Sequence, residues 1–232
     1  MNKKRITVLT GAGMSAESGL KTFRDANGLW EGYDVMQVAS PEGFAKNPEL
    51  VLEFYNQRRR QLLMVAPNAG HKALVELEKQ FNVNIITQNV DNLHEKAGSS
   101  NVLHLHGELL KVRSIANPNH VLDWSEDLNM GDTDDLGNQL RPHIVWFDEM
   151  VPLLEPAIKI ISKTDVVVII GTSMQVYPAA SLINYAPRNT PIYFIDPKPN
   201  VGDSDFDSLT IISKTATEGV PELVASLLLE NG

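Results

Sequence analysis

The sequence predicts an α/β protein with a Rossmann-like fold, in which a parallel sheet carries helices on both faces and two insertions form a small subdomain. Short, apolar, β-branched runs alternate with helix-like segments along the chain. Strands that are apolar throughout are typical of a parallel sheet covered on both sides. A glycine-rich turn also follows the first of these runs, where this class of fold holds phosphate groups.

The apolar pattern assigns much of the chain to strands and helices. The expected strands are Ile6–Thr10, Asn84–Thr87, Val102–Leu105, Ile144–Phe147, Val166–Gly171, Ile192–Asp196 and Thr210–Ser213. The expected helices are Pro48–Met64, Ala69–Gln80, Leu153–Ser162, Ala179–Tyr185 and Pro221–Leu229. Two regions break the alternation. We therefore expect a Rossmann-like domain of residues 1–24, 68–110 and 141–232, and a subdomain of residues 25–67 and 111–140.

Composition excludes several classes of function. The chain of 232 residues has no cysteine, which removes disulfides, thiol catalysis and cysteine-ligated zinc. Its net charge of −9 disfavours non-specific nucleic-acid binding. The longest apolar runs, such as Val166–Ile170, are far shorter than a membrane span, and no signal-peptide pattern is present. We expect a cytoplasmic protein without membrane or nucleic-acid partners.

The turn Gly11-Ala12-Gly13 fits a loose dinucleotide-binding pattern. Glycines allow a tight turn and let a phosphate approach backbone N–H groups. A dehydrogenase would place an acidic residue at the end of a second strand about 20 residues further on. Here the chain instead enters a polar loop that begins with Phe23 and Arg24. The pattern alone therefore leaves an ordinary strand–helix turn as the alternative.

Polar clusters follow further strands, and the carboxyl ends of parallel strands meet at one edge of a sheet. Gly171–Ser173 could bind an anion, or could cap the next helix. Gln88–Asp91 could hold ribose hydroxyls or a carboxamide, or could form a turn and a cap. The aromatic run Arg141–Glu149 could line an apolar tunnel, or could pack in the core.

His106 ends an expected strand and precedes a glycine, and histidine is the usual general base near neutral pH. His104 would face the same side of the strand, so periodicity alone does not choose between them. For His94 a cap or a local bond to Asp91 is expected. The remaining histidines lack supporting neighbours and are interpreted as incidental: His71, His120 and His143.

Tyr55 and Arg58 share one face of the expected helix Pro48–Met64. A phenol and a guanidinium could together hold a carboxylate, which the guanidinium binds with two parallel hydrogen bonds. Arg59 and Arg60 follow directly. From chemistry alone, a solvated basic face is therefore the simpler explanation.

Taken in order, these motifs resemble the sirtuin (Sir2) family of NAD-dependent protein-lysine deacylases, from Ile6 to about Leu229. The matching motifs are Gly-Ala-Gly-x-Ser-x-x-Ser-Gly with Phe-Arg after it, Thr-Gln-Asn-x-Asp-x-Leu-His, His-Gly, Val-x-Phe-x-Glu, Gly-Thr-Ser and Gly-Val-Pro. The resemblance implies that NAD is consumed as a co-substrate. The acyl oxygen attacks the ribose carbon as nicotinamide leaves, and the products are lysine, nicotinamide and 2′-O-acyl-ADP-ribose.

The resemblance also implies a role for each matching residue. The catalytic residues would be His106, as the general base, and Asn89, which with Gln88 would hold the nicotinamide ribose and a local water. Asp91 would bind the carboxamide, and Phe23 would cover the reacting ribose carbon. The residues that bind NAD would be Gly11, Ala12, Gly13, Ser15, Phe23, Arg24, Gln88, Asn89, Asp91, Gly171, Thr172, Ser173, Asp196 and Ala216. Those that bind the acylated lysine and its peptide would be Tyr55, Arg58, Val145, Trp146, Phe147 and Glu149, with the 147–149 backbone pairing with the peptide as an added strand.

The chain departs from the family pattern in two places. Members usually carry four zinc-binding cysteines, and Ser114 stands where the first is expected. We expect no zinc, and a module held by its own packing, with Trp124. Asp196 replaces the usual asparagine at the adenosine ribose, where a carboxylate can accept bonds from both hydroxyls and would repel a 2′-phosphate.

Tyr55-x-x-Arg58 resembles the branch of the family that removes succinyl and malonyl groups, with the arginine fixing the distal carboxylate. The resemblance therefore predicts a deacylase for acylated lysines of proteins, with acidic acyl groups favoured and acetyl as a further substrate. An NAD-consuming ADP-ribosyltransferase or NADase on the same scaffold is the alternative. The presence of both Asn89 and His106 favours deacylation. A non-catalytic binding module should have lost His106 or Asp91, and an oxidoreductase would need the missing acidic residue.

Overall fold

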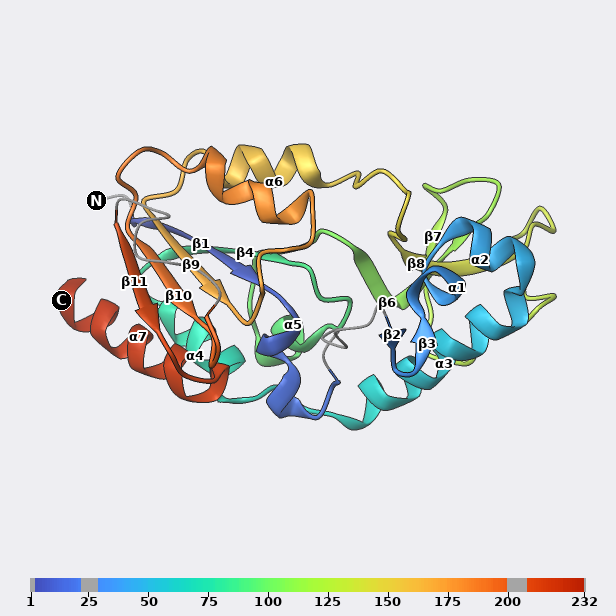
Figure 1. Ribbon diagram of the computed structural model, residues 1–232, viewed down its shortest axis with the longest axis horizontal. Coiled ribbons are helices and arrows are strands. Elements are labelled where there is room, and N and C mark those ends of the chain that lie inside the picture. The colour runs from blue at the N-terminus through green and yellow to red at the C-terminus, as the bar shows by residue number, and fades with distance from the viewer. Residues whose placement is uncertain (1–2, 22–28, 200–207, 232) are drawn as a thin grey trace.

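Six parallel strands form the main sheet in the computed structural model, which describes residues 3–21, 29–199 and 208–231. In spatial order the strands are β11 (Leu209–Ile212), β10 (Ile192–Ile195), β9 (Val166–Ile170), β1 (Arg5–Thr10), β4 (Asn82–Thr87) and β5 (Val102–His104). Each lies within two residues of its predicted range. Their carboxyl ends point toward the middle of the molecule, and the smaller part of the chain lies beyond them (Figure 1).

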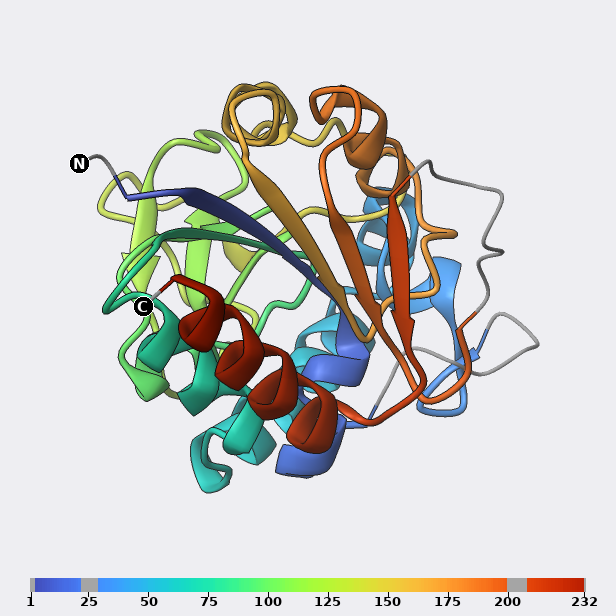
Figure 2. The same cartoon turned by 90° about the vertical axis from the view of Figure 1, so that its left-hand side faces the viewer.

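Helices cover both faces of this sheet, as the apolar strands predict (Figure 2). One face packs against α4 (Ala69–Leu77) and α7 (Ala216–Asn231) in one apolar cluster. The other packs against α6 (Leu154–Ile161) and the 3₁₀ segment η3 (Ala179–Tyr185) in a second cluster. The short helix α5 (Leu93–Ala97) contacts α4. Among the described residues, no helix is long and apolar enough to cross a membrane.

Several helices differ from their predicted form. The glycine turn after β1 leads into two 3₁₀ turns, η1 (Ala12–Met14) and η2 (Ala16–Ser18), and not into an α-helix. Residues 179–185 are likewise 3₁₀. The last helix begins at Ala216, five residues before the predicted Pro221, because the carbonyl of Thr215 already accepts the N–H of Gly219 at 2.8 Å.

The smaller part is built on an antiparallel sheet of β7 (Val121–Asp123), β6 (Gly107–Ser114) and β8 (Leu140–Ile144). It also contains the hairpin β2 (Leu29–Trp30) and β3 (Tyr33–Asp34), with helices α1 (Val35–Val38), α2 (Pro41–Lys46) and α3 (Pro48–Met64). The small sheet extends past both ends of the predicted insertion 111–140. The predicted strand Ile144–Phe147 is wrong, because β8 ends at Ile144.

Packing and one polar turn hold the module that was predicted to lack zinc. Leu52, Val112, Leu128 and Leu140 form its apolar cluster, and Trp124 packs against them. Asp134 caps the turn that follows it by accepting the N–H groups of residues 136 and 138 at 3.0 and 2.8 Å. A hydrogen bond from the Ser114 hydroxyl, with these turn bonds, lowers the pKa of Asp134 to about 2. Ser114, which replaces the first expected cysteine, thus joins the turn to β6.

Candidate active site

The loops after β1 and β9 meet backbone to backbone at the carboxyl edge of the sheet. Gly11 donates its N–H to the carbonyl of Ile170 at 3.0 Å, and Gly13 donates to the carbonyl of Gly171 at 2.8 Å. A Cβ on Gly13 would lie 2.6 Å from the Cα of Gly171, whose own φ is +60°. The glycines are therefore required for loop-to-loop contact, and the N–H groups of Gly11 and Gly13 are already bonded across it.

Asn89 connects these loops to the end of β4. Its Nδ2 donates to the carbonyl of Gly11 at 3.0 Å and to Ser15 Oγ at 3.2 Å. Ser15 in turn donates its hydroxyl to Asp91 at 2.9 Å. Burial raises the pKa of Asp91, while bonds from the N–H of Leu93 and from Ser15 oppose the rise. Three predicted cofactor-binding side chains, Ser15, Asn89 and Asp91, therefore form one bonded cluster.

His106 lies just beyond β5 with its ring held in one orientation. Its Nδ1 is 3.1 Å from the carbonyl of Gln88. A carbonyl can only accept, so Nδ1 carries the proton and Nε2 keeps a lone pair. Burial lowers the pKa of His106 although the Gln88 bond opposes it. Gln88 also donates its side-chain amide to Thr172 Oγ1 at 3.2 Å, which joins the histidine to the loop after β9.

The structure separates His106 from the other candidate bases. His104 Nε2 lies 2.6 Å from Glu95 and its Nδ1 lies 3.2 Å from the carbonyl of Asn89. Burial tends to lower the pKa of His104, but Glu95 outweighs it and the pKa is raised. His104 therefore bonds within the fold. The expected bond between His94 and Asp91 is wrong, because His94 Nε2 lies 3.2 Å from Thr10 Oγ1.

Arg58 lies in the same pocket as the nicotinamide-binding candidates. The pocket, of about 90 Å³, is lined by Arg58 and by Ala12, Ser15, Asn89 and Asp91 among others. The guanidinium stacks on Phe54, donates to the Phe54 carbonyl and lies 5.4 Å from the ring of Trp30. Its Nε is buried and has no hydrogen-bond partner among the described residues. Burial lowers the pKa of Arg58 to about 10. Arg58 is therefore not part of a solvated basic face, which was the simpler explanation from the sequence.

Tyr55 lies one turn away from Arg58 but does not line this pocket. It is fully buried, and its hydroxyl accepts the indole N–H of Trp146 at 2.9 Å. Burial raises the pKa of Tyr55 far above its usual value, so the phenol keeps its proton and can still donate it. Tyr55 thus positions Trp146, a residue predicted to line the acyl-lysine tunnel.

The segment 145–149 joins the two parts of the molecule. Val145 donates its N–H to the carbonyl of His106 at 2.9 Å, and Phe147 donates to the carbonyl of Ala39 at 2.9 Å. Trp146 is buried, whereas Phe147 is 40% exposed. The N–H groups of Phe147 and Glu149 are both bonded within the chain. A peptide could therefore pair only with the N–H of Asp148 and with carbonyls of this segment, and the added strand stays a prediction.

The carboxylate of Glu149 has a structural role in this arrangement, while the predicted contact of its backbone with a peptide stays a prediction. Its carboxylate accepts two bonds from Arg141, at 2.7 and 3.0 Å, and two from Arg113, both at 3.1 Å. It also accepts the N–H of Trp146 at 2.8 Å. Burial tends to raise the pKa of Glu149, but the arginines outweigh it and the pKa is lowered. Glu149 therefore fixes the segment 145–149 to the small sheet.

The remaining cofactor candidates lie toward the other strand ends. Thr172 is buried and accepts the N–H of Met174 at 3.2 Å, while Ser173 is half-buried. Asp196 is buried directly after β10 and accepts the N–H of Lys198 at 2.8 Å. Ala216 is buried at the start of α7. Phe23 and Arg24 lie outside the described residues.

Sequence reasoning missed two charged residues of the Arg58 pocket, Lys21 and Glu31. Their side chains form an ion pair of 2.7 Å. Gly32 is a turn signal that could have placed Glu31 near a turn, but nothing in the sequence brings that turn next to α3.

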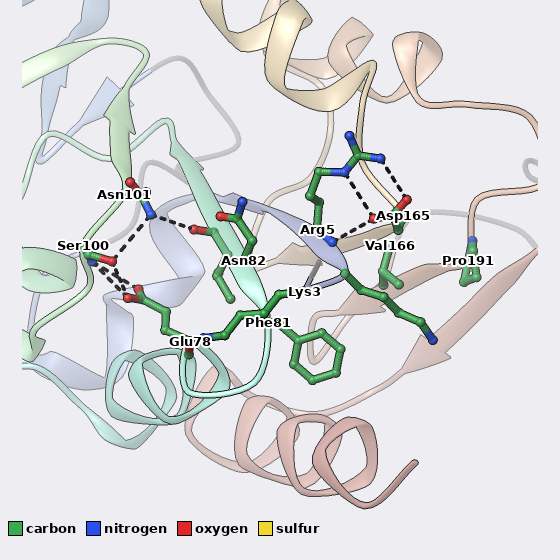
Figure 3. Close-up of a pocket in the computed structure, with 12 residues that line it drawn as sticks. Lys3, Arg5, Glu78, Phe81, Asn82, Ser100, Asn101, Asp165, Val166 and Pro191 are labelled. Atoms are coloured by element: carbon green, nitrogen blue, oxygen red, sulfur yellow. Dashed lines mark hydrogen bonds and ion pairs between the residues drawn. The ribbon is translucent and has the colours of Figure 1, made fainter. Parts of the chain in front are cut away.

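A hollow larger than the Arg58 pocket lies at the opposite end of the main sheet and is not a second candidate. It measures about 940 Å³ and is lined by residues from the start of β1, β4 and β9. Figure 3 shows two bonded pairs among its polar side chains: Arg5 with Asp165, and Ser100 with Glu78. Large volume here reflects an open surface with satisfied polar groups.

The carboxyl edge of the sheet fits a dinucleotide. The packed glycine loops at Gly11, Gly13 and Gly171 bring the ends of β1 and β9 together, and Thr172 supplies a hydroxyl beside them. The cluster around Asn89 offers amide and carboxylate groups of the kind that hold ribose hydroxyls and a carboxamide. His106 brings a neutral imidazole to the same edge.

Comparison with known sequences agrees with this geometry. The sequence model described as "Sir2 family" matches residues 11–178. A Helicobacter pylori protein named NAD-dependent protein deacylase is 57% identical over 225 residues, which span 97% of this chain and 98% of that protein. A protein of the same name from Bacteroides thetaiotaomicron is 55% identical over 231 residues, with 97% and 98% covered.

Solved structures give the same result for the fold. A structure described as a Sir2 homolog–NAD complex superposes with a TM-score of 0.87 at 38% identity, covering 99% of this chain and 91% of that one. A complex of Sir2 with a p53 peptide and NAD+ superposes with a TM-score of 0.77 at 25% identity, covering 98% and 95%. The match therefore includes the main sheet and the smaller part together.

Proposed function

Because the chain belongs to the Sir2 family and is an NAD-dependent protein deacylase, we propose that it removes acidic acyl groups, succinyl and malonyl, from lysines of proteins. The observation that carries this proposal is the environment of Arg58. Its guanidinium lines the pocket of Asn89 and Asp91, and its buried Nε has no hydrogen-bond partner among the described residues. A buried cation with an unused donor is costly unless a ligand supplies the acceptor.

The acyl carboxylate would be that acceptor. A guanidinium binds a carboxylate through two parallel hydrogen bonds, which an acetyl group cannot provide. The pKa of Arg58, lowered to about 10 by burial, still leaves the side chain charged at neutral pH. Tyr55 contributes indirectly, because its hydroxyl bonds to Trp146, which is predicted to line the acyl-lysine tunnel.

In the proposed reaction, NAD supplies the ribose carbon that bonds to the acyl oxygen as nicotinamide leaves. His106 takes a proton from a ribose hydroxyl at Nε2, because its Nδ1 proton is held by the carbonyl of Gln88. Asn89, Ser15 and Asp91 hold the nicotinamide end. Their mutual hydrogen bonds fix them before the ligand arrives, which lowers the entropy lost on binding.

A panel of acetyl-, succinyl- and malonyl-lysine peptides with NAD, analysed by mass spectrometry, tests this proposal. Acyl-ADP-ribose should form from the acidic acyl peptides with the higher kcat/KM. ADP-ribose released without any peptide would instead support an NADase. No turnover of succinyl- or malonyl-lysine would overturn the proposal.

The variant Arg58→Met should raise KM for succinyl-lysine by about 10- to 100-fold, the loss expected for one charge-assisted bidentate contact. Deacetylation should change by less than about twofold, since acetyl leaves the guanidinium unused. Arg60→Met is the matched control, because Arg60 is on the same helix but pairs with Glu53 and Asp127 outside the pocket. Equal losses for both substrates would mean that Arg58 does not bind the acyl group.

A further inference from the structure

Glu31 occupies an unusual place at the edge of the Arg58 pocket. It is the first residue of the two-residue turn between β2 and β3, with φ of 54°, and Gly32 follows with φ of 83°. Such a turn needs positive φ at both positions, and the first is usually asparagine, aspartate or glycine. The turn directs the Glu31 side chain into the pocket, where it is only 20% exposed.

Lys21 holds the Glu31 carboxylate in this position. Their ion pair measures 2.7 Å, and Lys21 is 72% exposed, so it approaches from the solvent side. Both residues line the pocket that contains Arg58. The pocket therefore already holds one carboxylate before any substrate enters.

Glu31 acts on Arg58 through charge and not through a hydrogen bond. The described hydrogen bond of Arg58 goes to the carbonyl of Phe54, and its guanidinium is stacked on that residue's ring. Burial lowers the pKa of Arg58, and Glu31 is the strongest of the nearby charges that oppose this. Removing the charge of Glu31 would thus leave the guanidinium in place and make the electrostatic potential around it more positive.

We propose that Glu31 is a specificity-determining residue, a resident carboxylate that opposes the entry of an acidic acyl group toward Arg58. This inference rests on the proposed function of Arg58. An acidic acyl chain must approach Arg58 against the charge of Glu31, whereas a neutral acyl chain does not meet this opposition. Glu31 therefore reduces the preference in KM for acidic over neutral substrates. The ion pair with Lys21 weakens this effect, because it partly neutralises the Glu31 carboxylate.

Glu31→Gln tests the inference, because it removes the charge and keeps the shape of the side chain. We expect KM for succinyl-lysine to fall by about three- to tenfold, with kcat unchanged and acetyl-lysine kinetics within about twofold of wild type. Lys21→Met should raise KM for succinyl-lysine, and should do so less when Glu31 is already glutamine. Glu42→Gln is the matched control, since Glu42 forms an exposed pair with Lys46 away from this pocket.

The outcomes separate this inference from the proposal on which it rests. If Arg58→Met is selective for succinyl-lysine but Glu31→Gln changes both substrates equally, Glu31 serves the cofactor or the fold and the inference fails. If Glu31→Gln weakens succinyl-lysine binding, Glu31 orients Arg58 and the inference also fails. If Arg58→Met is itself unselective, or succinyl-lysine is not turned over, both the proposed function and the inference fail.

Discussion

Two histidines two residues apart in the chain have opposite protonation tendencies because their partners differ. His104 faces the carboxylate of Glu95, which favours the charged imidazolium, and its pKa is raised. Among the described residues, the bonded partner of the His106 ring is the carbonyl of Gln88; the buried setting favours the neutral ring, and the pKa of His106 is lowered. The neutral histidine is the one that can serve as a base.

Replacing His106 by alanine should abolish formation of acyl-ADP-ribose while NAD binding persists. In the wild-type enzyme the base works only when neutral, so activity should be lost as pH falls through the lowered pKa of His106. The acidic limb of kcat/KM should therefore lie below pH 6.5, the ordinary value for histidine. The pH–rate profile checks this, with His120→Ala as the surface control. Near-normal turnover by the His106 variant would contradict the assignment.

Sequence reasoning named residues that the fold brings together, but it did not predict the balance of charges around them. The order of the motifs predicts a site made of glycine, asparagine, aspartate and histidine residues at strand ends. The fold brings three of the predicted residues, Ser15, Asn89 and Asp91, into contact. The relation of Arg58 to Glu31 could not be predicted. It depends on how a hairpin docks against α3, which is a matter of tertiary packing and not of local pattern.

At the scale of elements, the segment 145–149 connects the small sheet to the candidate tunnel. Arg113 on β6 and Arg141 on β8 converge on Glu149, and Glu149 holds the backbone of Trp146. The small sheet therefore positions the residues that the sequence predicts to line the tunnel.

Glu149→Gln should loosen this connection. Two guanidiniums that are about one-tenth exposed would lose their shared counter-charge, at a cost of about 2 kcal/mol in the free energy of unfolding. KM for acetyl- and succinyl-peptides should rise together, since the tunnel and not the acyl contact is disturbed. Denaturant titration and peptide kinetics measure the two effects. Asp148→Asn, an exposed neighbour, should change neither, and an unchanged KM for Glu149→Gln would refute the link.

The turn at Asp134 should make the small module sensitive to acid but not to chelators. The folded pKa of about 2 lies below the model-peptide value of 3.8. Its contribution to stability is therefore complete above about pH 4 and is lost as pH falls toward 2. Asp134→Ala should lower the melting temperature at neutral pH, whereas prolonged dialysis against EDTA should leave activity intact. Loss of activity in EDTA would show a metal that the sequence does not predict.

Local signals decided which elements could be predicted. Helix α3 matches its expected range because Asn47 caps it, accepting the N–H of Leu50 at 3.1 Å, and a proline follows the cap. Strand β8 was misplaced because Pro142 lies within it, opposite Val112, and a proline normally argues against a strand. It is tolerated because β8 is at the edge of its sheet. Trp146 was assigned to a strand although it packs in the cluster around α3.

At the scale of the whole molecule, two buried histidines lie between the main sheet and its helices. The rings of His71 and His94 are 4.8 Å apart, and both are fully buried. Burial lowers the pKa of His71 to about 4 and that of His94 well below its usual value. Both are therefore neutral in the folded protein, while the unfolded chain can protonate them.

The cytoplasmic location expected from the sequence stays a prediction.

Folding stability should consequently decline as pH falls from about 6.5 toward 4. In this window the unfolded chain binds protons that the folded protein does not, so each such histidine contributes a slope of up to about 1.4 kcal/mol per pH unit. His71→Gln should reduce the slope, and glutamine can keep the capping-box acceptor that His71 provides to Asn68. Urea unfolding at about pH 7.5, 6 and 5 samples this window. An unchanged slope, compared with His120→Gln, would contradict the assignment.

The interlocked glycine loops also restrict how this protein can diverge. Gly13 and Gly171 are more than 150 residues apart in the chain, yet neither can gain a Cβ without meeting the backbone of the other. A substitution in one loop cannot be accommodated by shrinking a side chain in the other, because there is none to shrink. Compensation would have to move a whole strand end. Natural variation should therefore accumulate around this pair of positions, in helices and surface turns, while the two glycines are inherited together.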